Sequence, residues 1–379
     1  MSGPLEAIKV LDFSAMIAGP YCTRMLADLG AEVVKVEPVQ GDFMRSSEPQ
    51  RAAADGSGHS AYYAALNAGK HSIAIDLKAP EGKQLAADLA AKADVVVENF
   101  RPGVMKRLGL DYDSLARENP KLVYCSISGY GQTGAAADRP GYAPIMHAAC
   151  GFELATLAYQ EGIERPLKSG IFVADVLSGS LAFGAVNAAL VSRERSGQGD
   201  YIDVSLMDCM LGLMLYECQE AQFPERFPRV LYQPVRARDG FLIVAPISQA
   251  NFEAMARAAS HPEWIADPRF NGPARRRNWV SLMGLLEAWA GEHSVAECEN
   301  AMLDGGVPCS RYQTVAEAMA SDAVKSRGTF ATVRDGAGEL LAPNPPFTLR
   351  NARAKVGEFV DSLDSSRERV VRDWLGKTA

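Results

Sequence analysis

One carboxylate stands alone in a long apolar stretch of this chain. Asp175 is the only charged residue from 170 to 192, and it follows the apolar run at 171–173. Burial of an ionised carboxylate without compensation is costly, so such a residue is normally held by hydrogen-bond donors or by the positive end of a helix. At the first turn of a helix we expect it to stay ionised near neutral pH. Asp175 is then either a helix cap, for which Asp is a preferred residue, or a carboxylate nucleophile.

A second motif has the spacing of a dinucleotide-binding loop. Gly-x-Gly-x-x-Gly occupies 129–134 and follows an expected strand. A dinucleotide loop needs a helix that begins inside the motif and an acidic residue about 20 positions later. Here Asp-Arg-Pro-Gly at 138–141 interrupts any helix. The sequence favours a glycine-rich turn over a nicotinamide or flavin site.

The first half of the chain alternates β-branched runs with helical patterns, which predicts an α/β fold. Strands separated by helices indicate a mainly parallel sheet with helices on both faces. Ligands of such sheets bind at the carboxyl ends of the strands, where the loops at 18–20, 99–100 and 129–131 fall. The expected strands are 8–13, 33–37, 71–77, 94–98 and 122–128, and the expected helices are 20–30, 80–92, 104–108, 177–195 and 205–218.

Proline-rich segments indicate how the chain divides. A length of 379 residues fits two domains. The segments 222–228 and 342–346 are rich in proline and typical of connections. The predicted organisation is a large Rossmann-like domain at 1–218 completed by 340–379, a linker at 219–229, a small α/β domain at 230–325 and a returning linker at 326–339.

Composition excludes several classes of protein. A net charge of −7 without a basic tract argues against a nucleic-acid partner. The chain has no run of about 18 uninterrupted apolar residues and no leader pattern, so we expect no membrane partner. Seven cysteines without a Cys-x-x-Cys pair favour free thiols in the cytoplasm. The five histidines lack His-x-x-x-His spacing, so no metal site is expected.

The motifs taken together resemble the family III CoA-transferases. This group includes formyl-CoA transferases and carnitine CoA-transferases, and the 2-methylacyl-CoA racemases are relatives. The resemblance is strong over about 5–210 and weaker beyond. It rests on Ala-Gly-Pro at 18–20, Leu-Ala-Asp-Leu-Gly-Ala-Glu-Val-Val-Lys-Val-Glu at 26–37, Asp-Val-Val-Val-Glu-Asn-Phe-Arg-Pro-Gly at 94–103, the glycine turn at 129–134 and Arg-x-x-Ser-Gly-x-Gly at 193–199.

The resemblance implies a fold, an assembly and a set of site residues. The fold is a Rossmann-like large domain with a smaller α/β domain, and two subunits form an interlocked homodimer. Asp175 falls on the family's catalytic aspartate. CoA is a substrate of these enzymes, and no cofactor stays bound. The implied CoA-binding residues are Met16, Ala18, Ile75, Lys78, Asn99, Phe100, Val104, Arg107, Tyr142 and, near the phosphates, Arg139.

The activity that the resemblance implies is transfer of CoA from an acyl-CoA to a small carboxylic acid. One alternative is a 2-methylacyl-CoA racemase, which pairs the aspartate with a histidine at the position of Tyr142; here His147 is the nearest candidate base. The other is a CoA-binding protein without turnover. Formyl-CoA transferases have glycines where this chain has Pro-Ile-Ser-Gln-Ala-Asn at 246–251 and a glutamine in place of Ile17, which argues against oxalate as acceptor.

The acyl end of the cleft is assigned to the polar segment at 42–67. Arg45 and His59 lie in this segment. Arginine is the side chain best suited to bind a carboxylate with two parallel hydrogen bonds. We predict that a short dicarboxylic acid is a substrate and that Arg45 binds its distal carboxylate; the alternative is that Arg45 is a solvated loop residue.

Overall fold

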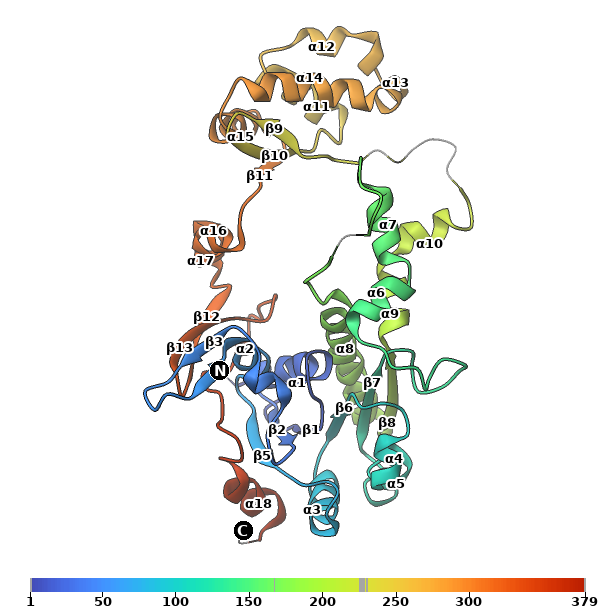
Figure 1. Cartoon of the computed structure of the whole chain (residues 1–379), viewed down its shortest axis with the longest axis vertical. Helices are drawn as coiled ribbons and strands as arrows, with labels where there is room; N and C mark the ends of the chain where they lie inside the picture. Colours follow the sequence, from blue (N-terminus) through green and yellow to red (C-terminus); the bar gives the residue numbers. More distant parts are fainter. Residues whose placement is uncertain (1, 167, 225–228, 230, 378–379) are drawn as a thin grey trace. The chain divides into compact units, whose positions relative to one another are not determined.

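The chain folds into two compact units, shown in Figure 1 as a computed structural model that describes residues 2–166, 168–224, 229 and 231–377. The first unit comprises the chain up to Gln222 and from Ser326 onward, and the second spans Phe223–Lys325. Each unit has its own hydrophobic core. Part of the predicted linker at 219–229, the residues 225–228, lies outside the described residues.

The centre of the first unit is a six-stranded, fully parallel sheet, which confirms the predicted α/β class. The strand order reverses at β1: β2 pairs with it on one side and β6 on the other, which is where ligands bind in open parallel sheets. The order is β5 (His71–Ala74), β2 (Glu32–Glu37), β1 (Lys9–Asp12), β6 (Val95–Glu98), β7 (Val123–Ser128) and β8 (Asp200–Ser205).

Both faces of the sheet are covered by helices because successive residues of each strand point to opposite sides. Val33 of β2 belongs to the core formed with α1 (Ala18–Asp28), α8 (Val173–Ser196) and α9 (Leu206–Leu213). Val34 belongs to the opposite core, which contains residues of α3, α4, α5 and α18. Figure 1 shows the two groups of helices on either side of the sheet. These four helices are Pro80–Ala90, Val104–Leu108, Tyr112–Glu118 and Arg367–Leu375.

Helix α8 is the long helix that carries Asp175 in its first turn. By length and composition it is the one described helix able to cross a membrane, a property that core helices of soluble proteins share. It packs along α1 and against β7 and β8. The contact with α1 is close: a Cβ on Gly179 would lie 2.5 Å from the carbonyl oxygen of Ala18. Glycine at 179 therefore lets α8 approach the start of α1, one turn after Asp175.

The segment predicted as a returning linker, 326–339, contains regular structure instead. Strand β12 (Phe330–Asp335) pairs antiparallel with β13 (Gly338–Pro343). At the turn, Oδ1 of Asp335 accepts from the N–H of Ala337 at 2.9 Å, and Gly338 has a positive φ of 98°, a value that favours glycine. The hairpin and α18 both belong to the first unit, together with the residues before 223.

The second unit combines a three-stranded antiparallel sheet with α-helices, of which α11 to α15 lie between β10 and β11 in the chain. The strand order is β11 (Cys309–Arg311), β10 (Gly240–Val244) and β9 (Val235–Ala237). Ser248, in the segment 246–251, caps α11 through a capping box with Asn251. The helices are α11 (Gln249–Ala258), α12 (Glu263–Ala266), α13 (Pro273–Arg277), α14 (Trp279–Gly291) and α15 (Val295–Asp304).

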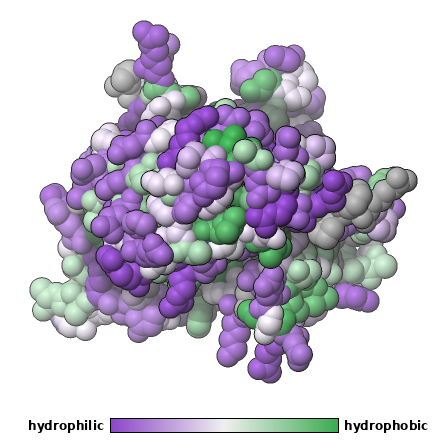
Figure 2. Space-filling model, turned by 90° about the horizontal axis from the view of Figure 1, so that it is seen from above, coloured by the Kyte–Doolittle hydropathy of each residue, from purple (hydrophilic) through white to green (hydrophobic). Residues whose placement is uncertain are grey.

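Shorter elements complete the chain, and the face seen in Figure 2 is mostly hydrophilic with small hydrophobic patches. In the first unit they are the 3-10 turn η1 (Phe43–Ser46), β3 (Gln50–Ala52), β4 (Gly58–Ser60), α2 (Ala61–Asn67), α6 (Ala143–Ala149), α7 (Phe152–Ala158) and α10 (Leu215–Glu220). The second unit also holds the 3-10 turn η2 (Pro268–Phe270) and α16 (Val315–Ala320), and α17 (Asp322–Arg327) follows.

Candidate active site

Two cavities open at the carboxyl ends of the parallel strands. The large cavity, of about 1380 Å³, is lined mainly by residues 13–16 after β1, 35–43 at and after the end of β2, and 75–78 after β5. The Asp175 cavity, of about 690 Å³, is lined mainly by residues 15–18, 99–102 and 139–144 together with Asp175. Both cavities share the walls formed by Ala15, Met16, Phe43 and Phe100.

The shared wall is held in an unusual backbone conformation. Met16 has a φ of 64°, a left-handed value that is uncommon for a residue other than glycine and that clusters at functional sites. The Asn99 side chain fixes the neighbouring peptide: its Oδ1 accepts from the N–H of Ala15 at 2.9 Å, and its Nδ2 donates to the Ala15 carbonyl at 2.7 Å. The loop after β6 thus fixes the loop after β1 at the junction of the two cavities.

Asp175 is the third residue of α8 and is half-buried. The N-cap position is Phe172, so the interpretation of Asp175 as a helix cap is wrong. Within the described residues no donor hydrogen-bonds to its carboxylate. Burial without a compensating donor raises the pKa of Asp175 to about 6. The carboxylate is therefore ionised at pH 7 to 8, while its lone pairs stay free.

Three residues that the sequence did not single out also form the wall around Asp175: Tyr62, Phe172 and Ser128. Burial, and then the charge of Asp175, raises the pKa of Tyr62. Ser128 is 8% exposed, and its hydroxyl has no hydrogen-bond partner in the described part of the chain. Ser128 ends β7, so its position at the carboxyl edge of the sheet was a usable signal, whereas nothing in the sequence marked Tyr62 or Phe172.

Most of the predicted CoA-binding residues line these cavities. Arg107 lines neither of the two, although it lies on α4 beside Gly103. His59 also lies outside both linings; its Nδ1 is 3.8 Å from Oδ2 of Asp335. The predicted CoA-binding residues that line the large cavity are Met16, Ile75, Lys78, Phe100 and Val104. The predicted residues that line the Asp175 cavity are Met16, Ala18, Asn99, Phe100, Arg139 and Tyr142.

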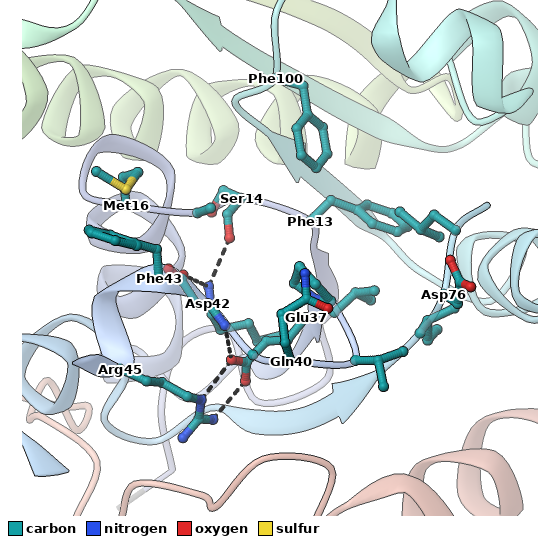
Figure 3. A pocket seen from close by; sticks show the side chains of 18 of the residues that line it. Phe13, Ser14, Met16, Glu37, Gln40, Asp42, Phe43, Arg45, Asp76 and Phe100 are labelled. Carbon is teal, nitrogen blue, oxygen red and sulfur yellow. Dashed lines mark hydrogen bonds and ion pairs between the residues drawn. The ribbon is translucent and has the colours of Figure 1, made fainter. Parts of the chain in front are cut away.

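Arg45 lines the large cavity, but it is paired with an internal carboxylate, which argues against the role predicted for it. Its Nε and Nη2 donate to the two carboxylate oxygens of Glu37, each at 2.7 Å. Figure 3 shows the guanidinium turned toward Glu37. Nη1 and Nη2 also donate to the Asp361 carbonyl, and the guanidinium lies 4.2 Å from the ring centre of Tyr63. The bidentate face that a substrate carboxylate would need is already occupied.

His147 does not face the Asp175 cavity. The residue is 1% exposed, and its Nε2 accepts a hydrogen bond from the backbone N–H of Ala174 at 3.1 Å. Its ring packs on Phe152, with the ring centres 5.5 Å apart. Because a general base must reach the Cα proton of a bound acyl-CoA, this placement removes the histidine on which the racemase alternative depended.

Comparison with known proteins identifies the family. The model of CoA-transferase family III matches residues 5–358. The chain is 36% identical to a succinate–glutarate CoA-transferase of Agrobacterium fabrum over 97% of both chains. It is 32% identical to a succinyl-CoA–D-citramalate CoA-transferase of Chloroflexus aurantiacus, covering 99% of this chain and 95% of that one. The crystal structure of a CAIB/BAIF family protein from Brucella suis superposes with a TM-score of 0.86, 31% identity and coverage of 99% and 100%. The chain belongs to the family III CoA-transferases, enzymes that transfer CoA from an acyl-CoA to a carboxylic acid.

Proposed function

We propose that this enzyme exchanges CoA between short dicarboxylic acids, with succinyl-CoA as a donor, and that Asp175 carries the covalent intermediates. The observation that supports the nucleophile is the free, ionised carboxylate of Asp175 in the wall of a cavity that adjoins a second, larger one. The substrate class is supported by the relatives named above, whose substrates are succinate, glutarate and D-citramalate.

The two cavities suit the two ends of an acyl-CoA. We assign the nucleotide end of CoA to the large cavity, where Lys78 supplies a cation for phosphate. The pantetheine arm then passes Met16 and Phe100, which line both cavities, and brings the thioester to Asp175. Asn99 keeps this passage open by fixing the peptide of Ala15.

The reaction then proceeds as two acyl exchanges at one carboxylate. Asp175 attacks the thioester carbonyl, and the CoA thiolate leaves, so that a mixed anhydride forms. The thiolate attacks the Asp175 carbonyl, which releases the donor acid and leaves an aspartyl-CoA thioester. The acceptor carboxylate attacks this thioester and expels the thiolate again, and a second mixed anhydride forms. The thiolate then attacks the acceptor carbonyl, which yields the new acyl-CoA and regenerates Asp175.

Trapping of the intermediate tests the assignment of Asp175. With succinyl-CoA and no acceptor, hydroxylamine converts an aspartyl thioester into a hydroxamate that peptide mass spectrometry locates. We expect the modification on Asp175 and its absence in the Asp175→Asn variant. Modification of a different carboxylate would refute the proposed nucleophile.

The distal carboxylate of a dicarboxylic acid needs a cation. We assign Arg139 to it in place of Arg45, and no longer to the CoA phosphates, because Arg139 lines the Asp175 cavity and not the large cavity. Arg101 and Arg139 both line the Asp175 cavity, and neither takes part in an ion pair within the described residues. We expect Arg139→Gln to raise KM for succinate and glutarate and to leave KM for a monocarboxylic acid unchanged. Arg101→Gln is the matched variant, and equal effects on mono- and dicarboxylic acids would refute the assignment.

We infer further that the enzyme is a cytoplasmic homodimer. All seven cysteines are free, which suits a reducing compartment. Large apolar residues are exposed on three successive helices: Leu181 and Val191 on α8, Leu211 on α9 and Leu215 on α10. A second copy of the chain would cover them. Sedimentation at micromolar concentration should give about twice the 40.7 kDa of one chain, and a monomer would contradict the inference.

A further inference from the structure

We propose that His147 is a positioning residue for Asp175, because its imidazole holds the first turn of the helix that carries the carboxylate. This role rests on the proposed function of Asp175 as the nucleophile. His147 lines neither cavity, so it acts through the backbone of α8 and not on the substrate.

The start of α8 lacks the usual side-chain cap. The first N–H groups of a helix have no partner within the helix, and a side chain at the N-cap position commonly supplies one. Here the N-cap residue is Phe172, which has no polar side chain. The N–H of Val173 donates to the Ile171 carbonyl at 2.9 Å, and the N–H of Ala174 donates to Nε2 of His147 at 3.1 Å. The cap therefore comes from α6, and it is made at the residue next to Asp175.

The acceptor role fixes the tautomer of His147. A ring nitrogen that accepts a hydrogen bond carries no proton, so neutral His147 has its proton on Nδ1. Burial lowers the pKa of His147, while Glu153 on α7 opposes this shift. Nδ1 is buried without a hydrogen-bond partner among the described residues. A buried N–H without a hydrogen-bond partner lowers the stability of the fold. We infer that this cost is retained because the bond from Ala174 to His147 fixes the position of Asp175.

His147 also connects two walls of the Asp175 cavity. Tyr142, Ala143 and Pro144, at the start of α6, line this cavity, and His147 follows one turn later on the same helix. Its bond to Ala174 joins that helix to the first turn of α8. A displacement of one wall relative to the other would move the carboxylate away from the thioester, and misplacement by about 1 Å can reduce a rate by about 10²-fold.

A pair of amide variants separates positioning from simple packing. The amide of His147→Gln reaches about as far as Nε2 and retains an acceptor for Ala174, whereas the amide of His147→Asn is one bond too short. We expect His147→Asn to lower kcat by roughly 10- to 100-fold at unchanged KM for succinyl-CoA. His147→Gln should recover most of kcat. The rate of hydroxamate formation at Asp175, measured in a single turnover, should follow kcat in both variants.

A control in the second unit accounts for lost stability. Ser294 caps α15, where its hydroxyl accepts from the N–H of Glu297 at 3.3 Å, far along the chain from either cavity lining. Ser294→Ala should lower the melting temperature without changing kcat. If His147→Asn retains kcat, or if His147→Gln fails to restore it, the positioning role is wrong. Retained activity in Asp175→Asn would instead refute the assignment of Asp175 as the nucleophile. The Asp175 variant therefore tests the proposed function, and the His147 variants test the positioning role.

Discussion

Two aspartates of the first unit show that donors, and not burial alone, decide the state of a carboxylate. Asp12 ends β1 and is 0% exposed, yet its pKa is lowered. Burial alone would raise that pKa, but the charges of Lys70 and Lys35 and hydrogen bonds from Ser14 and Thr23 outweigh it. Asp175 is less buried, has no donor and has a pKa raised to about 6.

The difference assigns the two carboxylates to different tasks. Oδ2 of Asp12 lies 3.1 Å from Nζ of Lys70 and accepts from Thr23 Oγ1 at 2.6 Å, and Oδ1 accepts from the N–H of Ser14 at 2.9 Å. Such a carboxylate fixes the end of β1 to α1 and has no lone pair left for chemistry. Asp175 lacks such hydrogen bonds and ion pairs among the described residues, so its carboxylate has free lone pairs for attack on a carbonyl.

The largest expected effect is on turnover. Asp175→Ala should lower kcat by at least ~10³-fold, because the covalent route is lost while the fold is retained. Steady-state exchange of CoA between succinyl-CoA and glutarate measures it, and calorimetric binding of CoA to the variant is the control for folding. A loss of kcat of less than tenfold would mean that Asp175, like Asp12, has a structural role and is not the nucleophile.

The reverse pattern is expected at Asp12. Asp12→Asn removes the ion-pair partner of the buried Lys70 ammonium and a nearby negative charge that also stabilises the charged form of Lys35. Removal of one partner from a buried ion pair costs about 3 to 5 kcal/mol. Urea titration should show this loss in the free energy of unfolding. A loss below about 1 kcal/mol would mean that Asp42, 3.0 Å from Lys35, is able to compensate.

The same substitution at Asp175 should stabilise the protein. Its pKa in the folded state lies above the unfolded value of 3.8, so folding is disfavoured progressively as pH rises from 3.8 through about 6 and stays so above that. Asp175→Asn removes this cost, which the pKa shift limits to about 3 kcal/mol. We expect a higher melting temperature for the variant at pH 7.5 and no gain at pH 4. A lower melting temperature at pH 7.5 would reveal a donor to Asp175.

The sequence predicted five of the six strands of the parallel sheet and missed the edge strand β8. Strands buried on both faces are continuous apolar runs, such as Val95-Val96-Val97 in β6, and these are visible without a structure. Strand β8 was not expected, since Asp200 and Asp203 interrupt its apolar residues and its first two residues are exposed. Patterns that mix acids with apolar residues do not distinguish an edge strand from a loop.

The sequence indicated which single residues could take part in the chemistry of the site. It did not indicate which side chains the packing of helices and strands brings next to them. Asp175 was visible as a lone charge, but its lack of donors depends on which side chains α2 and α6 bring to it. Arg45 was visible as a cation in a polar segment. Its pairing with Glu37 was not, because η1 folds back over the end of β2 to bring them together. The surroundings of Asp175 and of Arg45 both depend on distances between elements that are far apart in the sequence, and a local sequence pattern does not give such distances.

The smallest effect, the pH dependence of the first chemical step, tests the comparison most directly. Below its pKa Asp175 is protonated and cannot attack, so kcat/KM for succinyl-CoA should fall about tenfold per pH unit below about 6 and reach a plateau above it. The free carboxyl of the donor titrates near 4, which leaves pH 5 to 8 as the window for measurement. Asp12, with a pKa lowered from 3.8, should contribute nothing in that window. A flat profile from pH 5 to 8 would show that Asp175 has donors after all, and the contrast between the two aspartates would then disappear.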